Sequence, residues 1–192
     1  MSLDSALSLL DDFVNKCPSG KQTIFLGIDP GSTGAFALVN SQDPSTAIAL
    51  DIPTVKVPTG KKGRTGKPGY RTEVDLGALC ALFDLVEKLP ARLHVIIEKQ
   101  QPMPRDTALT AFSVGKNFGM WPLFLYSKGI SHDTVSPGVW KRAMGLSKKD
   151  KEFSRMQAQK LFPNAELHRK KDHNRAEALL LAEHARRISD GK

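Results

Sequence analysis

The first part of the chain combines a segment of helical periodicity with three short apolar runs. Apolar residues recur at helical spacing over residues 5–16, which predicts a helix. Residues 22–28 (QTIFLGI), 35–40 (AFALVN) and 46–52 (TAIALDI) are short, β-prone and joined by short turns. This pattern predicts three consecutive strands in an antiparallel meander.

The segment after the third run has a different pattern. Residues 53–71 contain Gly, Pro and five basic residues after Gly60, and they lack apolar periodicity, which predicts a long basic loop. Thr72 and Asp75 have the spacing of a capping box, so a helix is expected to follow and to run to about Lys88.

The rest of the chain predicts two further strands among helices. A continuous apolar run over residues 93–98 (LHVIIE) is typical of a buried central strand, and HDTV at 132–135 predicts a last strand. Helical spacing covers residues 105–128, where Gly119 and Pro122 interrupt it. Three further helices are expected over residues 137–145, 149–162 and 173–188. The order βββαβαβααα predicts an α/β fold with a mixed five-stranded sheet flanked by helices.

Charge is distributed unevenly along the 192 residues. The chain carries 28 Lys and Arg against 20 Asp and Glu, a net charge of +8. Residues 1–59 have three bases and six acids, whereas residues 128–192 have 15 bases and eight acids. Such a bias indicates a polyanionic partner, most often nucleic acid, with a generally basic surface as the alternative. Two cysteines without C-x-x-C spacing argue against a disulfide scaffold and a zinc cluster, and no apolar run has the length of a membrane span.

Three acidic residues occupy positions where chemistry is expected. Asp29 ends the first strand in GIDPG, Glu98 ends the buried strand in VIIEKQ, and Glu177 lies on the last helix. His173 precedes Glu177 by four residues, so both side chains lie on one face of that helix. If the helix packs on the sheet, this face brings both residues toward the two strand ends.

Carboxylates from separate elements are the ligands that a pair of Mg²⁺ ions needs for phosphodiester cleavage. Asp29 would bridge the two ions, while Glu98 and Glu177 would each complete one shell. His173 would ligate a metal or accept a proton from the attacking water, and Asp172 is the alternative fourth group. Each residue also has a simpler interpretation: an Asx turn at Asp29, a solvent-facing strand end at Glu98, and an exposed pair at the last helix.

The order of these motifs resembles the RuvC class of Holliday junction resolvases, which have a ribonuclease H-like fold. The resemblance is carried by GIDPGSTGAFALV, VIIEKQ, SPGVWKRAMGL and a last helix of the form H-x-x-x-E-A-x-x-L-A. VIIEKQQPMP and KKDHNRAEALLLAEHARR are similar to the chloroplast resolvases of plants. The match runs from about residue 22 to 188, so residues 1–21 are expected to form an N-terminal helical extension and residues 22–192 the nuclease domain.

The resemblance implies a homodimer that uses divalent metal, two Mg²⁺ or alternatively Mn²⁺ per site, to nick opposed strands of four-way junction DNA. It implies catalytic and metal-binding roles for Asp29, Glu98, Glu177 and His173, although bacterial members have H-x-x-D where this chain has a longer step ending in Glu. It also implies cleavage at a cytosine–cytosine step, a role in DNA recombination, repair and segregation, and a chloroplast location. The first residues show no targeting pattern, so no transit peptide is expected within this sequence.

The resemblance further implies DNA contacts. Lysines that reach the scissile phosphate in the class correspond to Lys141 and to Lys149, which is expected to be catalytic; Lys148 and Lys151 lie close by. The loop after Glu98 is expected to enter the junction centre. The residues expected to bind DNA outside the lysine segment are Lys61, Lys62, Arg64, Lys67, Arg71, Gln101, Met103 and Lys116.

Two interpretations compete with the nuclease. The turn GIDPGSTG is also similar to phosphate loops of actin-like ATPases, but these need two lobes and a second loop. A catalytically silent nucleic-acid-binding domain of the same fold is the other alternative. In the helix over 105–128, Phe118, Met120, Trp121 and Phe124 form either a dimer face or part of the core.

Overall fold

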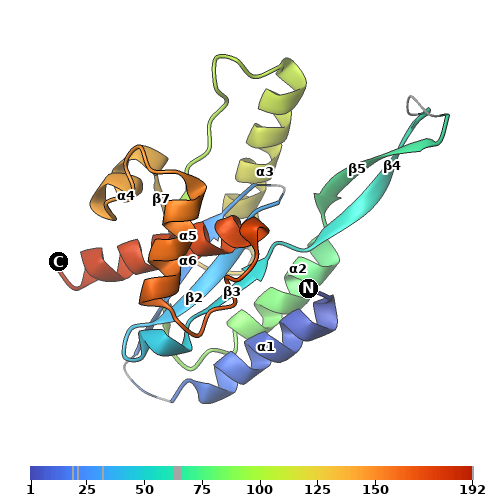
Figure 1. Ribbon diagram of the computed structural model, residues 1–192. Coiled ribbons are helices and arrows are strands. Elements are labelled where there is room, and N and C mark those ends of the chain that lie inside the picture. The colour runs from blue at the N-terminus through green and yellow to red at the C-terminus, as the bar shows by residue number, and fades with distance from the viewer. Residues whose placement is uncertain (19, 21, 32, 63–65, 192) are drawn as a thin grey trace.

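The computed structural model describes residues 1–18, 20, 22–31, 33–62 and 66–191. Its centre is a five-stranded sheet in the order β3-β2-β1-β6-β7 (Figure 1). The strands are β1 (Thr23–Asp29), β2 (Ala35–Asn40), β3 (Ile48–Asp51), β6 (Arg92–Glu98) and β7 (His132–Val135). β1, β2 and β3 pair antiparallel, whereas β1, β6 and β7 pair parallel, so the predicted mixed sheet is confirmed.

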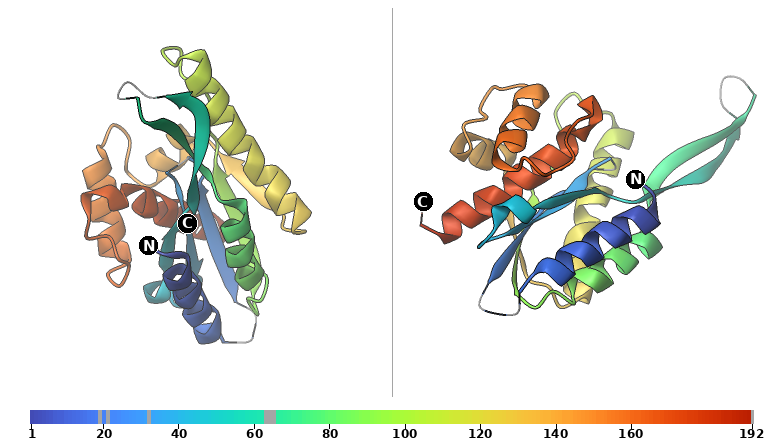
Figure 2. Two further views of the ribbon diagram at one scale, coloured as in Figure 1. Left: turned by 90° about the vertical axis from the view of Figure 1, so that its right-hand side faces the viewer. Right: turned by 60° about the horizontal axis from the view of Figure 1, so that its bottom comes forward.

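Helices cover both faces of this sheet (Figures 1 and 2). On one face, α6 (His173–Ser189) lies across the first three strands and β6, and α5 (Lys151–Leu161) packs on α6. α4 (Pro137–Ala143) adds Trp140 to the same core cluster. On the other face, α2 (Leu76–Val86) and α3 (Ala108–Ser127) cover the sheet, while α1 (Leu3–Lys16) packs on α2.

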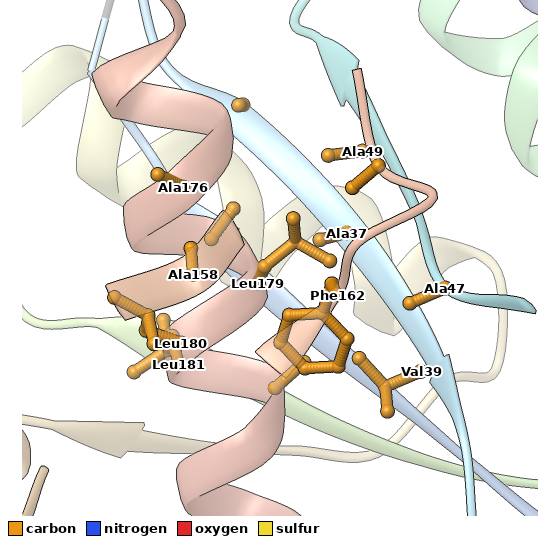
Figure 3. Close-up of a cluster of buried hydrophobic side chains, with 14 of the residues drawn as sticks. Ala37, Val39, Ala47, Ala49, Ala158, Phe162, Ala176, Leu179, Leu180 and Leu181 are labelled. Atoms are coloured by element: carbon orange, nitrogen blue, oxygen red, sulfur yellow. The ribbon is translucent and has the colours of Figure 1, made fainter. Parts of the chain in front are cut away.

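The central strands are apolar throughout because both of their faces are buried. In β1, Phe25 belongs to the core beneath α6, whereas Ile24 and Leu26 belong to the core beneath α2 and α3. This division follows the two-residue period of a strand. Small residues dominate the side of β2 and β3 that faces α6: Ala37 and Ala49 lie near Leu179 and Phe162 in Figure 3. They let α6 approach the sheet closely.

The prediction of a long basic loop is wrong. Residues 54–62 and 68–74 form β4 (Thr54–Lys62) and β5 (Pro68–Val74), an antiparallel two-stranded hairpin that projects from the body (Figure 2). Its side chains are almost all exposed or half-buried, so the sequence has no apolar alternation to mark it. Thr72 lies in β5, and Asp75 alone caps α2 by accepting from the Ala78 amide at 3.1 Å.

α3 is continuous through Gly119 and Pro122, contrary to the predicted interruption. Burial of Trp121 and Leu125 holds both sides of the proline against the core, and such packing overrides local propensity. Phe118, Met120 and Phe124 are half-buried in the same cluster, which supports the core interpretation for these residues. Within the described residues, no helix combines the length and hydropathy needed to cross a bilayer.

Candidate active site

Asp29 and Glu98 lie at one edge of the sheet because β1 and β6 run parallel and end together. Ile28 is in register with Ile97, so the two acids follow at neighbouring positions. Both side chains are buried, which is unusual for carboxylates. The parallel pairing of β1 and β6 thus places the two carboxylates side by side at the ends of these strands.

Glu177 reaches the same edge from α6. The absence of a side chain at Gly27 allows this helix to lie close to β1. A Cβ atom placed on Gly27 would lie 2.6 Å from the backbone nitrogen of Ala182, so only glycine lets the helix backbone rest on β1. Gly27 is two residues before Asp29, and the contact also involves the backbone of Ala178, next to Glu177. The close approach of α6 to β1 thus determines where Glu177 lies relative to Asp29.

The turn after β1 orients the Asp29 carboxylate. Asp29 Oδ1 accepts from the Gly31 amide at 3.3 Å and from Gln100 Nε2 at 3.3 Å. The first bond is the Asx-type contact that the simpler interpretation expects, and it coexists with a position in the acid cluster. Gln100 was missed by sequence reasoning, although its place two residues after Glu98 could have identified it.

Burial and repulsion between carboxylates raise the pKa values of Asp29 and Glu98. Burial, together with repulsion from the Glu177 carboxylate, raises the pKa of Asp29 to about 6, against the lowering effects of Gly31, Lys141 and Lys151. Burial, followed by repulsion from Asp29, raises the pKa of Glu98 to about 7. The nearby lysines therefore do not neutralise the negative charge of the cluster, which is typical of a site that binds cations.

The charges of two lysines act on these acids. Lys141 Nζ donates to Glu177 Oε1 at 3.0 Å, and the charge of Lys151 acts on both Asp29 and Glu98. Lys149 instead stacks its ammonium over the Phe153 ring, 4.9 Å from the centroid, and no described contact joins it to the acids. Lys148 adopts a left-handed backbone conformation with φ of 59°.

His173 is half-buried at the start of α6, where its Nδ1 lies 3.3 Å from the carbonyl oxygen of Lys170. It lines a pocket with Thr33, Asp51 and Asn174 that Asp29, Glu98 and Glu177 do not line. The described contacts thus do not join His173 to the three acids.

Asp172, the alternative fourth group, is buried and accepts from Arg169 through both carboxylate oxygens. Arg169 holds the pKa of Asp172 below its usual range despite the opposing effect of burial. Sequence reasoning also missed two contacts of α6: Arg175 pairs bidentately with Asp51, and Asn174 donates to the Thr33 carbonyl.

The acids fit a divalent cation by their chemistry. Oxygen ligands from separate elements, buried and deficient in positive charge, suit a hard ion such as Mg²⁺. Within the part of the chain that the structure describes, no three His, Cys, Asp or Glu side chains are already arranged around one metal position. Asp29, Glu98 and Glu177 are the residues that would hold the ion.

The predicted DNA-binding residues lie mainly on exposed surfaces around this edge. Lys61 and Lys62 are on β4, Lys67 is in the turn before β5, and Arg71 is on β5; Arg64 lies outside the described residues. Glu73 contacts both Arg71 and Lys116 of α3, the latter at 3.3 Å, and so ties the hairpin to the helix. Gln101 and Met103 are exposed in the loop between β6 and α3.

Comparison with known proteins supports the resemblance seen in the motifs. No family model matches the chain. Over 117 residues, 59% of the chain, the sequence is 31% identical to the Holliday junction resolvase MOC1, chloroplastic, of Chlamydomonas reinhardtii. The chain covers only 13% of that relative's length. The predicted similarity to chloroplast resolvases is confirmed by this match.

Solved structures of a bacterial resolvase share the fold. Thermus thermophilus RuvC in complex with a Holliday junction substrate has a TM-score of 0.54 at 18% identity, covering 90% of this chain and 97% of that one. A second T. thermophilus RuvC structure has a TM-score of 0.51 at 19% identity, covering 88% and 96%. The predicted ribonuclease H-like fold of the RuvC type is confirmed.

Proposed function

We propose that the chain is a metal-dependent endonuclease that cuts four-way DNA junctions. The observation that carries the proposal is the convergence of Asp29, Glu98 and Glu177 at one edge of the sheet, with raised pKa values at the first two. Buried acids gathered without a matching number of cations are costly to the fold, so their presence favours a role in binding a cation. The RuvC-type fold and the MOC1 match support DNA junctions as the substrate.

Asp29, Glu98 and Glu177 would hold two divalent cations, and these would activate a water molecule and stabilise the leaving oxygen of the phosphodiester. Gly31 and Gln100 hold the Asp29 carboxylate in place. Lys141 and Lys151 supply positive charge beside the phosphate. His173 is proposed as a fourth ligand or as the group that accepts the proton of the attacking water.

The DNA would cross the sheet edge between the hairpin and the lysines of α4 and α5. Lys61, Lys62, Lys67 and Arg71 would contact phosphates of one arm, and Lys148, Lys149 and Lys151 those near the cut. Met103, which is exposed in the loop after Glu98, would wedge against unstacked bases at the junction centre. This loop is also the proposed reader of a cytosine–cytosine step.

Paired nicks require two active sites, so we place the partner copy at α3. The exposed apolar side chains of α3 lie on one face of the helix: Leu109, Phe112, Leu123 and Tyr126. This stripe replaces the residues first expected at a dimer face, which are packed in the core. By resemblance to the chloroplastic relative, the proposed setting is recombination and segregation of chloroplast DNA.

The test uses a labelled four-way junction and a linear duplex of matched sequence, each with and without Mg²⁺. We expect Mg²⁺-dependent nicks at symmetric positions of the junction only. Asp29→Asn should abolish nicking while the gel-shift affinity for the junction survives, because the substitution removes a cation ligand and keeps the basic surface. Products from both substrates, or full nicking by Asp29→Asn, would contradict the proposal.

A further inference from the structure

Lys141 occupies an unusual position for a DNA-contacting lysine. Its ammonium lies 3.0 Å from Glu177 Oε1, and the lysine and glutamate side chains are only 30% and 10% exposed. Trp140, the preceding residue, is fully buried, and the Lys141 Nζ lies 5.2 Å from its ring centroid. The buried tryptophan anchors α4 so that the next side chain points into the acid cluster.

The ammonium group of Lys141 interacts with three carboxylates. Lys141 pairs directly with Glu177, and its charge also acts on Asp29 and Glu98. Lys151 acts on the latter two from α5, but no described hydrogen bond joins it to them. Lys141 is therefore the cation in direct contact with the cluster among the residues that the structure describes.

This pairing conflicts with metal binding. A carboxylate oxygen that accepts from an ammonium cannot at the same time offer that lone pair to a cation, and two positive charges in one buried site repel. The lack of a ready three-donor arrangement in the described part of the chain agrees with this conflict. The repulsion between the two charges therefore makes the lysine and a metal ion compete for Glu177.

We propose that Lys141 is an internal counter-ion that competes with a divalent cation for Glu177 and leaves it when the cation binds. The inference rests on the proposed metal site and adds an order of events to it. The released ammonium becomes available to a DNA phosphate only after the metal is in place. Metal binding and phosphate binding would then favour each other through one side chain.

The first experiment measures Mn²⁺ binding by calorimetry on the full chain without DNA. Lys141→Met should bind Mn²⁺ at least fivefold more tightly than the wild type, because the competitor for Glu177 is gone. Arg142→Met is the matched control, since it removes one positive charge from the next, exposed position of α4. The control should change the affinity less than twofold; equal affinities of Lys141→Met and the wild type would overturn the inference.

The second experiment follows the wild-type lysine directly. Acetylation by an amine-specific reagent, quantified by peptide mass spectrometry, should be slow at Lys141 without metal and at least threefold faster with saturating Mn²⁺. Lys128, which is paired with Asp84 and Glu87 away from the site, is the internal control and should not respond. An unchanged Lys141 rate in the presence of bound metal would contradict the exchange.

Asp29→Asn separates the two proposals. If this variant binds Mn²⁺ as tightly as the wild type, the carboxylate metal site itself is wrong. If it loses Mn²⁺ binding while Lys141 behaves identically with and without metal in the wild type, the metal site stands and the exchange fails.

Discussion

At the scale of single residues, the acid cluster places function and stability in opposition. Asp29 and Glu98 are buried with pKa values of about 6 and about 7, so their ionised forms are disfavoured in the folded protein. In the unfolded chain the same groups ionise freely at lower pH. The metal-free fold therefore loses stability as the pH rises from about 4 through these values. A bound cation would restore the stability that ionisation of the two acids removes.

Asp29→Asn should for this reason stabilise the metal-free protein while it abolishes activity. At about pH 8 we expect the free energy of unfolding in urea to rise by about 3 kcal/mol, since the pKa of Asp29 rises from 3.8 to about 6 and each pKa unit corresponds to about 1.4 kcal/mol. The gain should vanish below about pH 4, where both states are protonated. Asp12→Asn on the exposed surface of α1 is the control and should show no such pH dependence. A variant less stable than the wild type at high pH would contradict the electrostatic argument.

His184 makes stability depend on pH in the opposite direction. It is 4% exposed on α6, its Nε2 has no hydrogen-bond partner among the described residues, and burial, followed by repulsion from Arg187, lowers its pKa. Because the folded-state pKa lies below the ordinary value of about 6.5, the contribution of the neutral ring is fully present above that pH and is lost below it.

His184→Leu should remove this acid sensitivity. Between about pH 7.5 and pH 5, the wild type should lose unfolding free energy relative to the variant. His168→Leu, at an exposed position, should follow the wild type. Parallel pH curves for His184→Leu and the wild type would show that the histidine is not the source.

At the scale of elements, the contact between α6 and β1 assembles the site. Gly27 removes the side chain that would separate the helix from the strand, and small residues on β2 and β3 do the same farther along (Figure 3). Arg175 pairs with Asp51 at the end of β3, and Asn174 donates to Thr33 in the turn after β1. The first turn of α6 is thus tied to the same turn that orients Asp29.

Gly27→Ala tests this arrangement. The added methyl group would overlap the backbone of α6, and overpacking of this kind costs about 1–3 kcal/mol. Because α6 must move, we expect junction nicking to fall by more than tenfold while gel-shift affinity changes little. Gly77→Ala is the control, since its methyl group would meet only Asp75 Oδ1 at 3.5 Å. Wild-type nicking by a folded Gly27→Ala protein would show that the close approach is not needed.

At the scale of the whole molecule, the charges and the projecting hairpin define a side for DNA. The net charge of +8 is concentrated after residue 59, and the hairpin carries Lys61, Lys62 and Lys67 away from the body (Figure 2). Its contact with α3 through Glu73 and Lys116 holds the arm beside the helix. Affinity for the junction should therefore depend on phosphate contacts and fall steeply with salt.

Replacement of Lys61, Lys62 and Lys67 by Ala should weaken junction binding and reduce the slope of log affinity against log salt by about 3, or about one for each phosphate that the hairpin would otherwise neutralise. Lys16→Ala and Lys88→Ala, near the opposite edge of the sheet, should leave the slope unchanged. Fluorescence anisotropy over a range of salt concentrations measures both. An unchanged slope in the triple variant would exclude the hairpin from the DNA interface.

The sequence by itself determined the sheet and the identity of the acids. Strands buried on both faces need continuous apolar runs, and a carboxylate directly after such a run, as at Asp29 and Glu98, is visible without coordinates. The tertiary structure alone decided the hairpin, because exposed strands need no apolar alternation, and the unbroken α3, because packing of Trp121 overrides a local proline. It also decided that Lys141, not Lys149, touches the acid cluster. The distances of α6 and α4 from the sheet decide which side chains of separate elements meet. Those distances are set by packing in three dimensions.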